Sequence, residues 1–295
     1  MKFFRHYSEV KKLKPAGIRG LARDVALNAF CLMEKWVNRG AELNKPRVQF
    51  VYLHHVFEDE EEGFRSLLNI LSQQYTFISY SEAISKIIGN KVDKPYLSFS
   101  FDDGFKNNLR AAAILETFGV SGCFFINPGI VGETDFNKIE RHCRVRLNFP
   151  PVEFMNWNDV EDLMNRGHEI GSHTMNHINV ANATPDDFEM DCMETFRAIS
   201  EKCGQVKHFA YPYGRYFHFN RSAKDTVLRA GFTSCASAER GCHVLNGEAV
   251  EADDLFIRRD HIILDWKPSH IQFFLNKNAR NASKAGNFYP TNLSL

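Results

Sequence analysis

Residues 96–127 of the chain, YLSFSFDDGFKNNLRAAAILETFGVSGCFFIN, decide its fold class. The stretch begins with an apolar run that ends in two aspartates. It continues with a helical pattern as far as Gly119 and ends in a second apolar run at residues 121–127. Two apolar strands joined by a helix form a βαβ unit, in which the strands lie parallel in one sheet. The stretch therefore predicts a parallel α/β fold.

The same alternation of strands and helices continues on both sides of this unit. Further strands are predicted at residues 48–55, 168–174, 208–213, 232–237 and 255–262. All are largely continuous apolar runs, as expected when helices cover both faces of a parallel sheet. The pattern is compatible with an open sheet and with a closed barrel.

Capping residues predict where several helices begin and end. Thr184, followed by Pro185, is expected to begin the longest helix, and Asn158 the helix before it. Glycines adopt the left-handed conformation that often ends a helix. Four of them stand between a helical pattern and a strand: Gly119, Gly167, Gly204 and Gly231.

Composition restricts the partners and the compartment. Lysines plus arginines and aspartates plus glutamates each number 36, and this balance argues against nucleic acid as the main partner. The seven cysteines are scattered and form no CxxC pair, so buried free thiols in a reducing compartment are expected. The N-terminus has no apolar run of signal-peptide length, and a cytoplasmic location is therefore expected.

Two segments fall outside the alternation. Residues 1–45 are predicted to be a helical extension of a catalytic domain at residues 46–295. The apolar stripe of this extension could pack on the barrel or, helped by nearby basic side chains, touch a membrane surface. Residues 128–155 are predicted to be a long loop. Its arginines, Arg141, Arg144 and Arg146, could bind a phosphate or carboxylate, or could simply be solvated.

Polar side chains that suit a metal follow two of the predicted strands. Asp102 and Asp103 end one strand, and His173 and His177 follow another. The carboxyl ends of parallel strands meet at one edge of the sheet, so these side chains are expected to converge. One carboxylate and two imidazoles leave coordination positions open, as in a catalytic metal site. Alone, Asp-Asp-Gly is also good turn chemistry, and a His-x-x-x-His spacing often occurs by chance.

Three motifs in sequence order resemble the polysaccharide deacetylase family (carbohydrate esterase family 4, with the chitooligosaccharide deacetylases). They are SFDDG at 100–104, GHEIGSHTMNH at 167–177 and YPYG at 211–214, and the resemblance extends from about Val48 to Ile263. It implies a distorted (β/α) barrel with fewer than eight full units. It also implies a metal-dependent hydrolase that removes an N-acetyl group from an amino sugar.

The resemblance also implies roles for individual residues. Asp102 matches the general base, which would accept a proton from the attacking water. Asp103, His173 and His177 match the ligands of a divalent metal, usually zinc. Tyr213 matches the residue whose backbone N–H helps to hold the oxyanion.

The chain departs from the family pattern in two places. Ala210 stands where the family usually carries an arginine that orients the base, and the late histidine motif that supplies the general acid has no clear match. His261 and His55 are the candidates for the acid. Arg258 or Arg259 is expected to replace the arginine, and strand alternation would put Arg259 and His261 on one face. Surface ion pairs for the arginines and simple packing for His261 are the alternative.

The expected substrate is a sugar nucleotide or a lipid-linked glycan, since no export signal is present. Two other functions remain open from the sequence. One is hydrolysis of the C–N bond of a non-sugar amide, with the same metal site. The other is a catalytically silent glycan-binding protein, which Ala210 and the missing histidine motif would suit.

Overall fold

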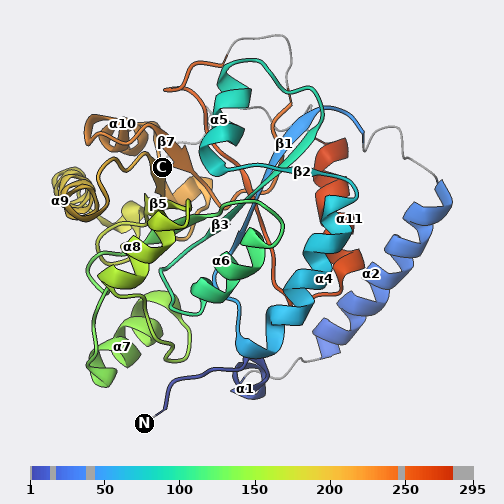
Figure 1. Cartoon of the computed structure of the whole chain (residues 1–295), viewed down its shortest axis with the longest axis horizontal. Coiled ribbons are helices and arrows are strands. Elements are labelled where there is room, and N and C mark those ends of the chain that lie inside the picture. Colours follow the sequence, from blue (N-terminus) through green and yellow to red (C-terminus); the bar gives the residue numbers. More distant parts are fainter. Residues whose placement is uncertain (1, 14–17, 38–43, 245–249, 282–295) are drawn as a thin grey trace.

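Eight parallel strands form one sheet in the computed structural model, which describes residues 2–13, 18–37, 44–244 and 250–281 (Figure 1). The strands are hydrogen-bonded in the order β7-β6-β5-β4-β3-β1-β8, and β2 pairs with β3 outside this path. Their bounds are β1 Arg47–Leu53, β2 Thr76–Phe77, β3 Pro95–Phe101, β4 Cys123–Ile126, β5 Glu169–Ser172, β6 His208–Ala210, β7 Ser234–Ala236 and β8 Arg259–His261. All seven strands predicted from the sequence are present, and only the two-residue β2 was missed.

The two ends of the sheet meet, so that the barrel is nearly closed. Ala236 in β7 forms a parallel bridge to Ile257, two residues before β8. The Ile257 N–H donates to the Cys235 carbonyl at 3.1 Å, and the Ser237 N–H donates to the Ile257 carbonyl at 2.9 Å. The distorted, incomplete (β/α) barrel implied by the resemblance is confirmed.

Alternate residues along the strands pack on opposite sides of the barrel wall. Phe50, Phe125 and Ile257 belong to an inner cluster, which includes Tyr80 of α5 (Tyr80–Ile88). Their sequence neighbours, such as Val51, belong to the outer cluster beneath the helices. Because both sides are buried, the strands are continuous apolar runs rather than alternating ones.

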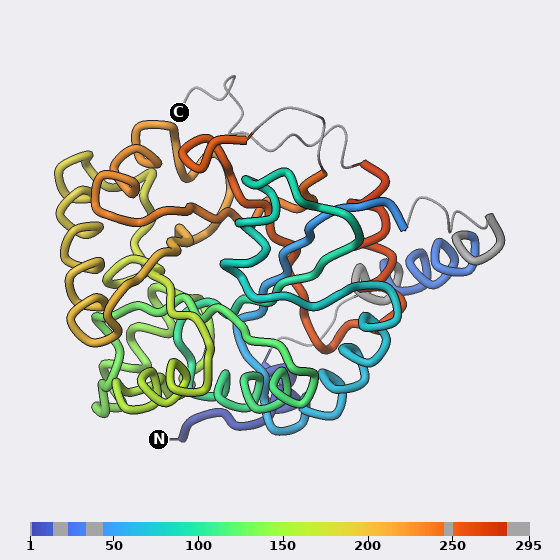
Figure 2. The backbone as a smooth tube through the Cα atoms, turned by 45° about the horizontal axis from the view of Figure 1, so that its top comes forward, coloured from blue at the N-terminus to red at the C-terminus, as the bar shows by residue number. Residues whose placement is uncertain are grey.

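The covering helices follow the strands along the chain and surround the sheet (Figures 1 and 2). They are α4 Glu61–Ser72, α6 Asn108–Glu116, α8 Trp157–Asn165, α9 Pro185–Cys203, α10 Arg221–Arg229 and α11 Pro268–Arg280. The seven cysteines are free thiols, five of them buried, as expected.

Most of the predicted helix ends are confirmed. Thr184 caps α9 by accepting from the Asp187 N–H at 3.2 Å, and all four predicted glycines have positive φ. The prediction for α8 was wrong, since its cap is Asn156 rather than Asn158. Asn156 and Asp159 accept reciprocally from each other's backbone N–H at 2.9 Å. This reciprocal capping box fixes the start of the helix two residues earlier.

The N-terminal segment packs against the barrel at two places. The backbone N–H groups of Tyr7 and Ser8, at the start of α1 (Tyr7–Leu13), donate to the Asp59 carboxylate at 2.7 and 2.9 Å. Helix α2 (Ile18–Val37) lies along α11 (Figures 1 and 2), where Asn28 contacts His270 at 3.0 Å. Packing of this segment on the barrel is thus confirmed. Among the described residues, no helix is both long enough and apolar enough to cross a membrane.

Residues 128–155 are not one long loop, and that prediction was wrong. They contain α7 (Phe136–His142) and the π-helix η2 (Cys143–Leu147), which ends at Asn148 with φ 49°. Ile139 and Cys143 are buried in a small cluster with Phe57, Phe105 and Phe154 at the barrel rim. Few apolar positions anchor this segment. With mostly polar residues between them, the sequence shows no apolar pattern that would predict the two short helices.

Candidate active site

A cavity of about 350 Å³ lies at the carboxyl ends of β1, β3, β6 and β8. Six functional side chains line it: His54, His55, Asp103, His177, Tyr213 and His261. Asp102 and His173 are buried beside their neighbours in this group. The structure therefore brings all the predicted site residues to one place and adds His54, which was not predicted.

Asp103, His173 and His177 form a group that could hold a metal ion. The Asp103 Oδ1 lies 3.5 Å from the Nε2 of each histidine, and one ligand atom from each residue lies within 4.8 Å of the others. All three side chains are buried, and the Asp103 Oδ1 has no hydrogen-bond partner among the described residues. The His173 Nδ1 donates to the Ala210 carbonyl at 2.7 Å, which leaves Nε2 unprotonated toward Asp103. The group fits a divalent cation.

The electrostatics of these three residues agree with that fit. Burial, with help from the Asp102 charge, raises the pKa of Asp103 well above its ordinary value. Burial lowers the pKa of both His173 and His177. A buried carboxyl between two neutral imidazoles lacks a positive partner, and a bound cation is the charge that would stabilise its ionised form.

Left-handed backbone conformations are concentrated at this site. Asp103 has φ 74°, His177 has φ 53° and Tyr213 has φ 64°, although none of them is a glycine. This conformation costs such a residue about 1–2 kcal/mol. Residues held in it are concentrated at active sites, where surrounding packing enforces the geometry. Here the left-handed turns bring two metal-ligand candidates and Tyr213 to the same cavity.

Arg259 holds Asp102 through two hydrogen bonds. The Nη1 and Nη2 of Arg259 donate to the two carboxylate oxygens at 2.7 and 2.9 Å, and its Nε donates to the Ser237 carbonyl at 2.9 Å. The guanidinium also lies over the rings of Tyr52 and Phe125, at 4.6 and 5.1 Å. Burial raises the pKa of Asp102, but Arg259 and the nearby histidines more than reverse this and lower it to about 2.

The position predicted for a replacement cation is thus confirmed. Ala210 is fully buried and places no charge at the site. Arg259 comes from β8 and reaches Asp102 from there, whereas Arg258 lies over the Tyr216 ring at 5.2 Å. Strand alternation explains why adjacent arginines have different surroundings.

Three histidines line the cavity beside Asp103 and have different partners. The His54 Nδ1 lies 3.1 Å from the His261 Nε2, and His261 stacks on Tyr52 at 4.7 Å. The His55 Nδ1 instead lies 3.3 Å from the Glu60 carboxylate. Because Leu53 pairs with Phe101, His54 stands level with Asp102 at the ends of adjacent strands. Burial lowers the pKa of His54 to about 4, so this imidazole is neutral near pH 7.

Tyr213 and Arg146 form the outer wall of the cavity. The Tyr213 ring lies 5.1 Å from that of His177, and its hydroxyl donates to the Arg146 carbonyl at 3.3 Å. Of the three arginines predicted to bind an anion, only Arg146 lines this cavity. Arg144 pairs with Glu140 at 2.8 Å, and Arg141 is exposed on α7.

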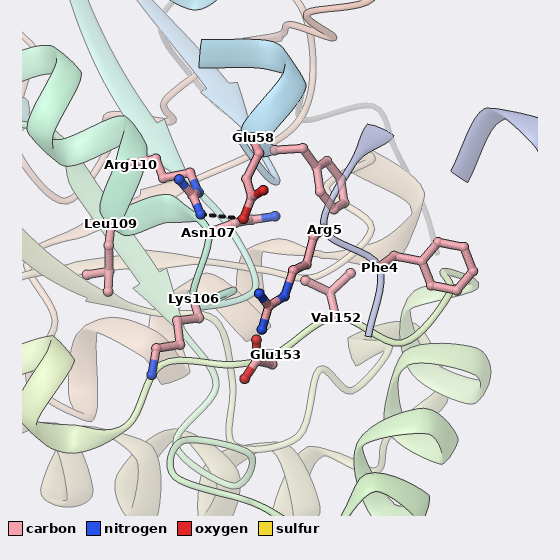
Figure 3. A pocket seen from close by; sticks show the side chains of 10 residues that line it. Phe4, Arg5, Glu58, Lys106, Asn107, Leu109, Arg110, Val152 and Glu153 are labelled. Atoms are coloured by element: carbon pink, nitrogen blue, oxygen red, sulfur yellow. Dashed lines mark hydrogen bonds and ion pairs between the residues drawn. The ribbon is translucent and has the colours of Figure 1, made fainter. Parts of the chain in front are cut away.

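A different hollow of about 330 Å³ lies between the N-terminal segment and α6 (Figure 3). Two of its cations are paired with carboxylates. Arg110 pairs with Glu58 at 2.8 Å and with Glu61 at 2.7 Å, and Lys106 pairs with Asp159 at 3.4 Å. In the described part of the chain, the three-residue metal-ligand group lies in the first cavity and not in this one.

The cavity of this nearly closed α/β barrel lies at the carboxyl ends of the strands, where barrel enzymes carry their active sites. The polysaccharide deacetylase family model matches residues 89–235, which contain all three motifs. The chain belongs to this family and is a hydrolase acting on carbon–nitrogen bonds other than peptide bonds. The match excludes β1 and β8, so that His54, Arg259 and His261 lie outside it.

Solved structures share the fold. A de-N-acetylase from Aggregatibacter actinomycetemcomitans is 18% identical with a TM-score of 0.62, over 77% of this chain and 99% of that one. IcaB from Ammonifex degensii is 19% identical with a TM-score of 0.61, over 77% and 97% of the two chains. The deacetylase PplD from Streptococcus pyogenes, solved with acetate, is 16% identical with a TM-score of 0.59, over 78% and 97%.

Proposed function

We propose that the chain is a metal-dependent deacetylase that removes the N-acetyl group of an amino sugar. The observation that carries this proposal is the buried group of Asp103, His173 and His177, with Asp102 held beside it by Arg259. These three residues would hold a Lewis acid beside the Asp102 carboxylate. Family membership and the deacetylase relatives support the choice of the acetamide bond.

A bound metal would supply Lewis-acid chemistry only. A divalent cation, by preference Zn²⁺, held by the carboxylate and two imidazoles would supply Lewis-acid activation of water and of the acetamide carbonyl. The remaining chemistry falls to the chain's own residues.

Asp102 takes the proton of the attacking water, and Arg259 fixes the orientation of its carboxylate. The Tyr213 N–H donates to the carbonyl oxygen as negative charge develops on it. No described residue accepts a hydrogen bond from this N–H, which leaves it available. Each such donor is commonly worth about 3–4 kcal/mol of transition-state stabilisation.

His54 delivers a proton to the departing amine. Its Nδ1 is engaged with His261, so its Nε2 is the nitrogen left to meet the substrate. The proton taken by Asp102 passes to His54 and on to the amine, which balances the reaction to acetate and a free amino sugar. His261 positions His54, and His55 has a separate partner in Glu60.

The glycan-binding alternative loses its main support in this structure. It depended on Ala210 and on the missing late histidine motif. Arg259 contacts Asp102 from β8, and His54 and His261 line the same cavity. A silent protein would also have no use for the strained backbone at Asp103, His177 and Tyr213.

Acetate release tests the proposal. Purified, metal-loaded protein should release acetate from N-acetylated amino sugars and much less from simple amides such as acetamide. Asp102→Asn should abolish the release while it keeps its metal. Equal activity of Asp102→Asn, or a preference for simple amides, would contradict the proposal.

A further inference from the structure

A second cavity adjoins the active-site cavity. It has a volume of about 720 Å³ and lies between α1 and the segment of residues 136–151. Tyr7, Asn148 and Phe149 line both cavities, so the two are immediate neighbours. Its volume falls within the range of small-molecule binding sites. We call it the α1 groove.

The α1 groove is lined mainly by apolar side chains. Phe4, Val10, Leu13, Phe136 and Phe149 contribute to its walls, together with two prolines. The charged side chains along it have partners of their own. Lys2 pairs with Glu9 at 2.8 Å, Lys11 with Asp265 at 2.6 Å, and Arg144 with Glu140 at 2.8 Å. The groove therefore suits an apolar occupant, because a polar one would lose hydrogen bonds to water.

Large apolar side chains are exposed on the groove itself and beside residues that line the two cavities. Leu13 of α1 is 58% exposed, Val145 of η2 is 65% exposed and Phe217 is 61% exposed. Phe217 reaches the cavity wall through His218, whose ring contacts that of Tyr213 at 5.4 Å.

Arg146 provides a cation where the two cavities join. It lines the active-site cavity, and Asn148, two residues later, lines both. Unlike Arg144, the Arg146 guanidinium forms no ion pair or hydrogen bond with a described residue. An unpaired guanidinium beside a substrate cavity suits a phosphate, whose oxygens accept two parallel hydrogen bonds.

We propose that the substrate is an N-acetylated amino sugar joined through phosphate to a long apolar chain. The sugar lies in the active-site cavity, the phosphate at Arg146 and the apolar chain in the α1 groove. This inference rests on the proposed deacetylase function. A sugar nucleotide or a longer glycan would instead place hydroxyl groups and heterocycles against apolar walls.

Binding of alkyl phosphates tests the groove without any need for catalysis. Calorimetry with n-butyl, n-octyl and n-dodecyl phosphate should show affinity rising by about fourfold per methylene while the chain still lies inside the groove. Leu13→Asp should weaken n-dodecyl phosphate by about tenfold or more and leave n-butyl phosphate unchanged. Leu32→Asp, at an exposed apolar position on α2, is the matched control and should change neither. Affinity independent of chain length, or equal losses in the two variants, would overturn the proposal.

The phosphate contact has its own matched pair. Arg146→Gln should weaken all three alkyl phosphates by a similar factor of about 10, because each carries the same head group. Arg141→Gln removes an exposed arginine from the same segment and should have no effect. Equal effects of the two substitutions would remove Arg146 from the proposal.

Turnover separates this inference from the proposed function. The substrates are N-acetylglucosamine 1-phosphate as its dodecyl and methyl esters, and the corresponding sugar nucleotide. The dodecyl ester should have the highest kcat/KM, and Leu13→Asp should raise KM for that ester alone. Acetate release that is equal for all three, with Leu13→Asp unaffected, would overturn the groove and leave the deacetylase intact. Chain-length-dependent binding without acetate release from any substrate would support the groove and contradict the deacetylase.

Discussion

At the scale of single residues, Arg259 is the most informative side chain in the molecule. It reaches Asp102 from β8, at the far end of the chain, and does so in place of the residue at position 210. Its guanidinium is fully buried between two aromatic rings. Asp102 therefore has its cation on β8, whereas the resemblance led us to look for one on β6.

Two Arg259 variants should distinguish the effect of the positive charge beside Asp102 from the effect of the paired hydrogen bonds that orient its carboxylate. Arg259→Ala leaves a buried carboxylate without its partner and should lower the free energy of unfolding by about 3–5 kcal/mol. Arg259→Lys keeps the charge but loses the paired hydrogen bonds, and should fold while kcat falls by up to about 100-fold. Denaturant unfolding and steady-state kinetics measure the two effects. A stable, fully active Arg259→Ala would show that Asp102 needs no such partner.

Asp102 and Asp103 should have separable roles although they are adjacent. Asp102→Asn preserves the ligand group, so metal content should remain near one ion per chain while kcat collapses by about 10²–10⁴-fold. Asp103→Asn should lose metal affinity together with activity. Elemental analysis of both purified variants decides the matter. If Asp102→Asn proved to be the metal-poor variant, the two assignments would be reversed.

The acid can be identified by the choice of leaving group. His54→Gln should slow cleavage of an acetamide by about 10²–10⁴-fold, because a departing amine needs a proton. It should barely affect p-nitrophenyl acetate, whose leaving group needs none. His55→Gln is the matched control and should leave the ratio of the two rates unchanged. Equal impairment of His54→Gln on both substrates would exclude it as the acid.

The sequence predicts some of these residues and not others for a physical reason. Asp103, His173 and His177 each follow an apolar strand, and parallel strands bring their ends to one edge. His54 was missed because β1 ends at Leu53, so that the first histidine, not the second, stands level with Asp102. Only the strand register, which a single apolar run does not contain, decides between adjacent side chains.

At the scale of elements, strand β8 carries both Arg259, which contacts Asp102, and the buried carboxyl group of Asp260. Arg259 meets the base, and Asp260 is buried beside Asn278 and 3.7 Å from Arg240. Burial raises the pKa of Asp260 to about 7, although Arg240 opposes the shift. The strand is therefore sensitive to pH on the side that does not face the base.

Asp260 should make the stability of the protein depend on pH. Its pKa is about 7 in the folded protein and about 3.9 when unfolded. The folded state therefore binds this proton more tightly than the unfolded state does. The resulting contribution of Asp260 to the free energy of unfolding is complete below about pH 4 and is lost as the pH rises to about 7. Asp260→Asn should flatten this slope and raise stability near pH 8, by about 4 kcal/mol at most. Chemical unfolding of both proteins across this range measures the effect. Parallel pH profiles would contradict it.

Element prediction succeeded where apolar runs were long and failed where they were short. Seven of the eight barrel strands and the helices α6 and α9 were predicted, since each carries its own apolar pattern and end signals. β2 has only two residues, and α7 and η2 keep only Ile139 and Cys143 buried. Elements this short are stabilised by tertiary contacts that a local sequence window does not contain.

At the scale of the whole molecule, the N-terminal segment completes the surface that the barrel presents to its substrate. Tyr7 lines both the active-site cavity and the α1 groove, and backbone hydrogen bonds to Asp59 hold the start of α1 in place. The sequence indicated a helical extension that packs on the barrel. That the extension reaches the active site could not be predicted, because the contact joins positions 7 and 59 through the fold alone.

We propose that Asp103, His173 and His177 hold the metal on which deacetylation depends. The most direct measurement is acetate release by metal-free protein during titration with zinc, for the wild type and for His173→Ala. The wild type should be inactive after chelation and should regain activity up to a plateau at one zinc ion per chain. His173→Ala, still folded, should remain inactive through the same range because two ligands hold a catalytic ion too weakly. Full activity of the chelated wild type, or an identical titration of His173→Ala, would contradict the claim.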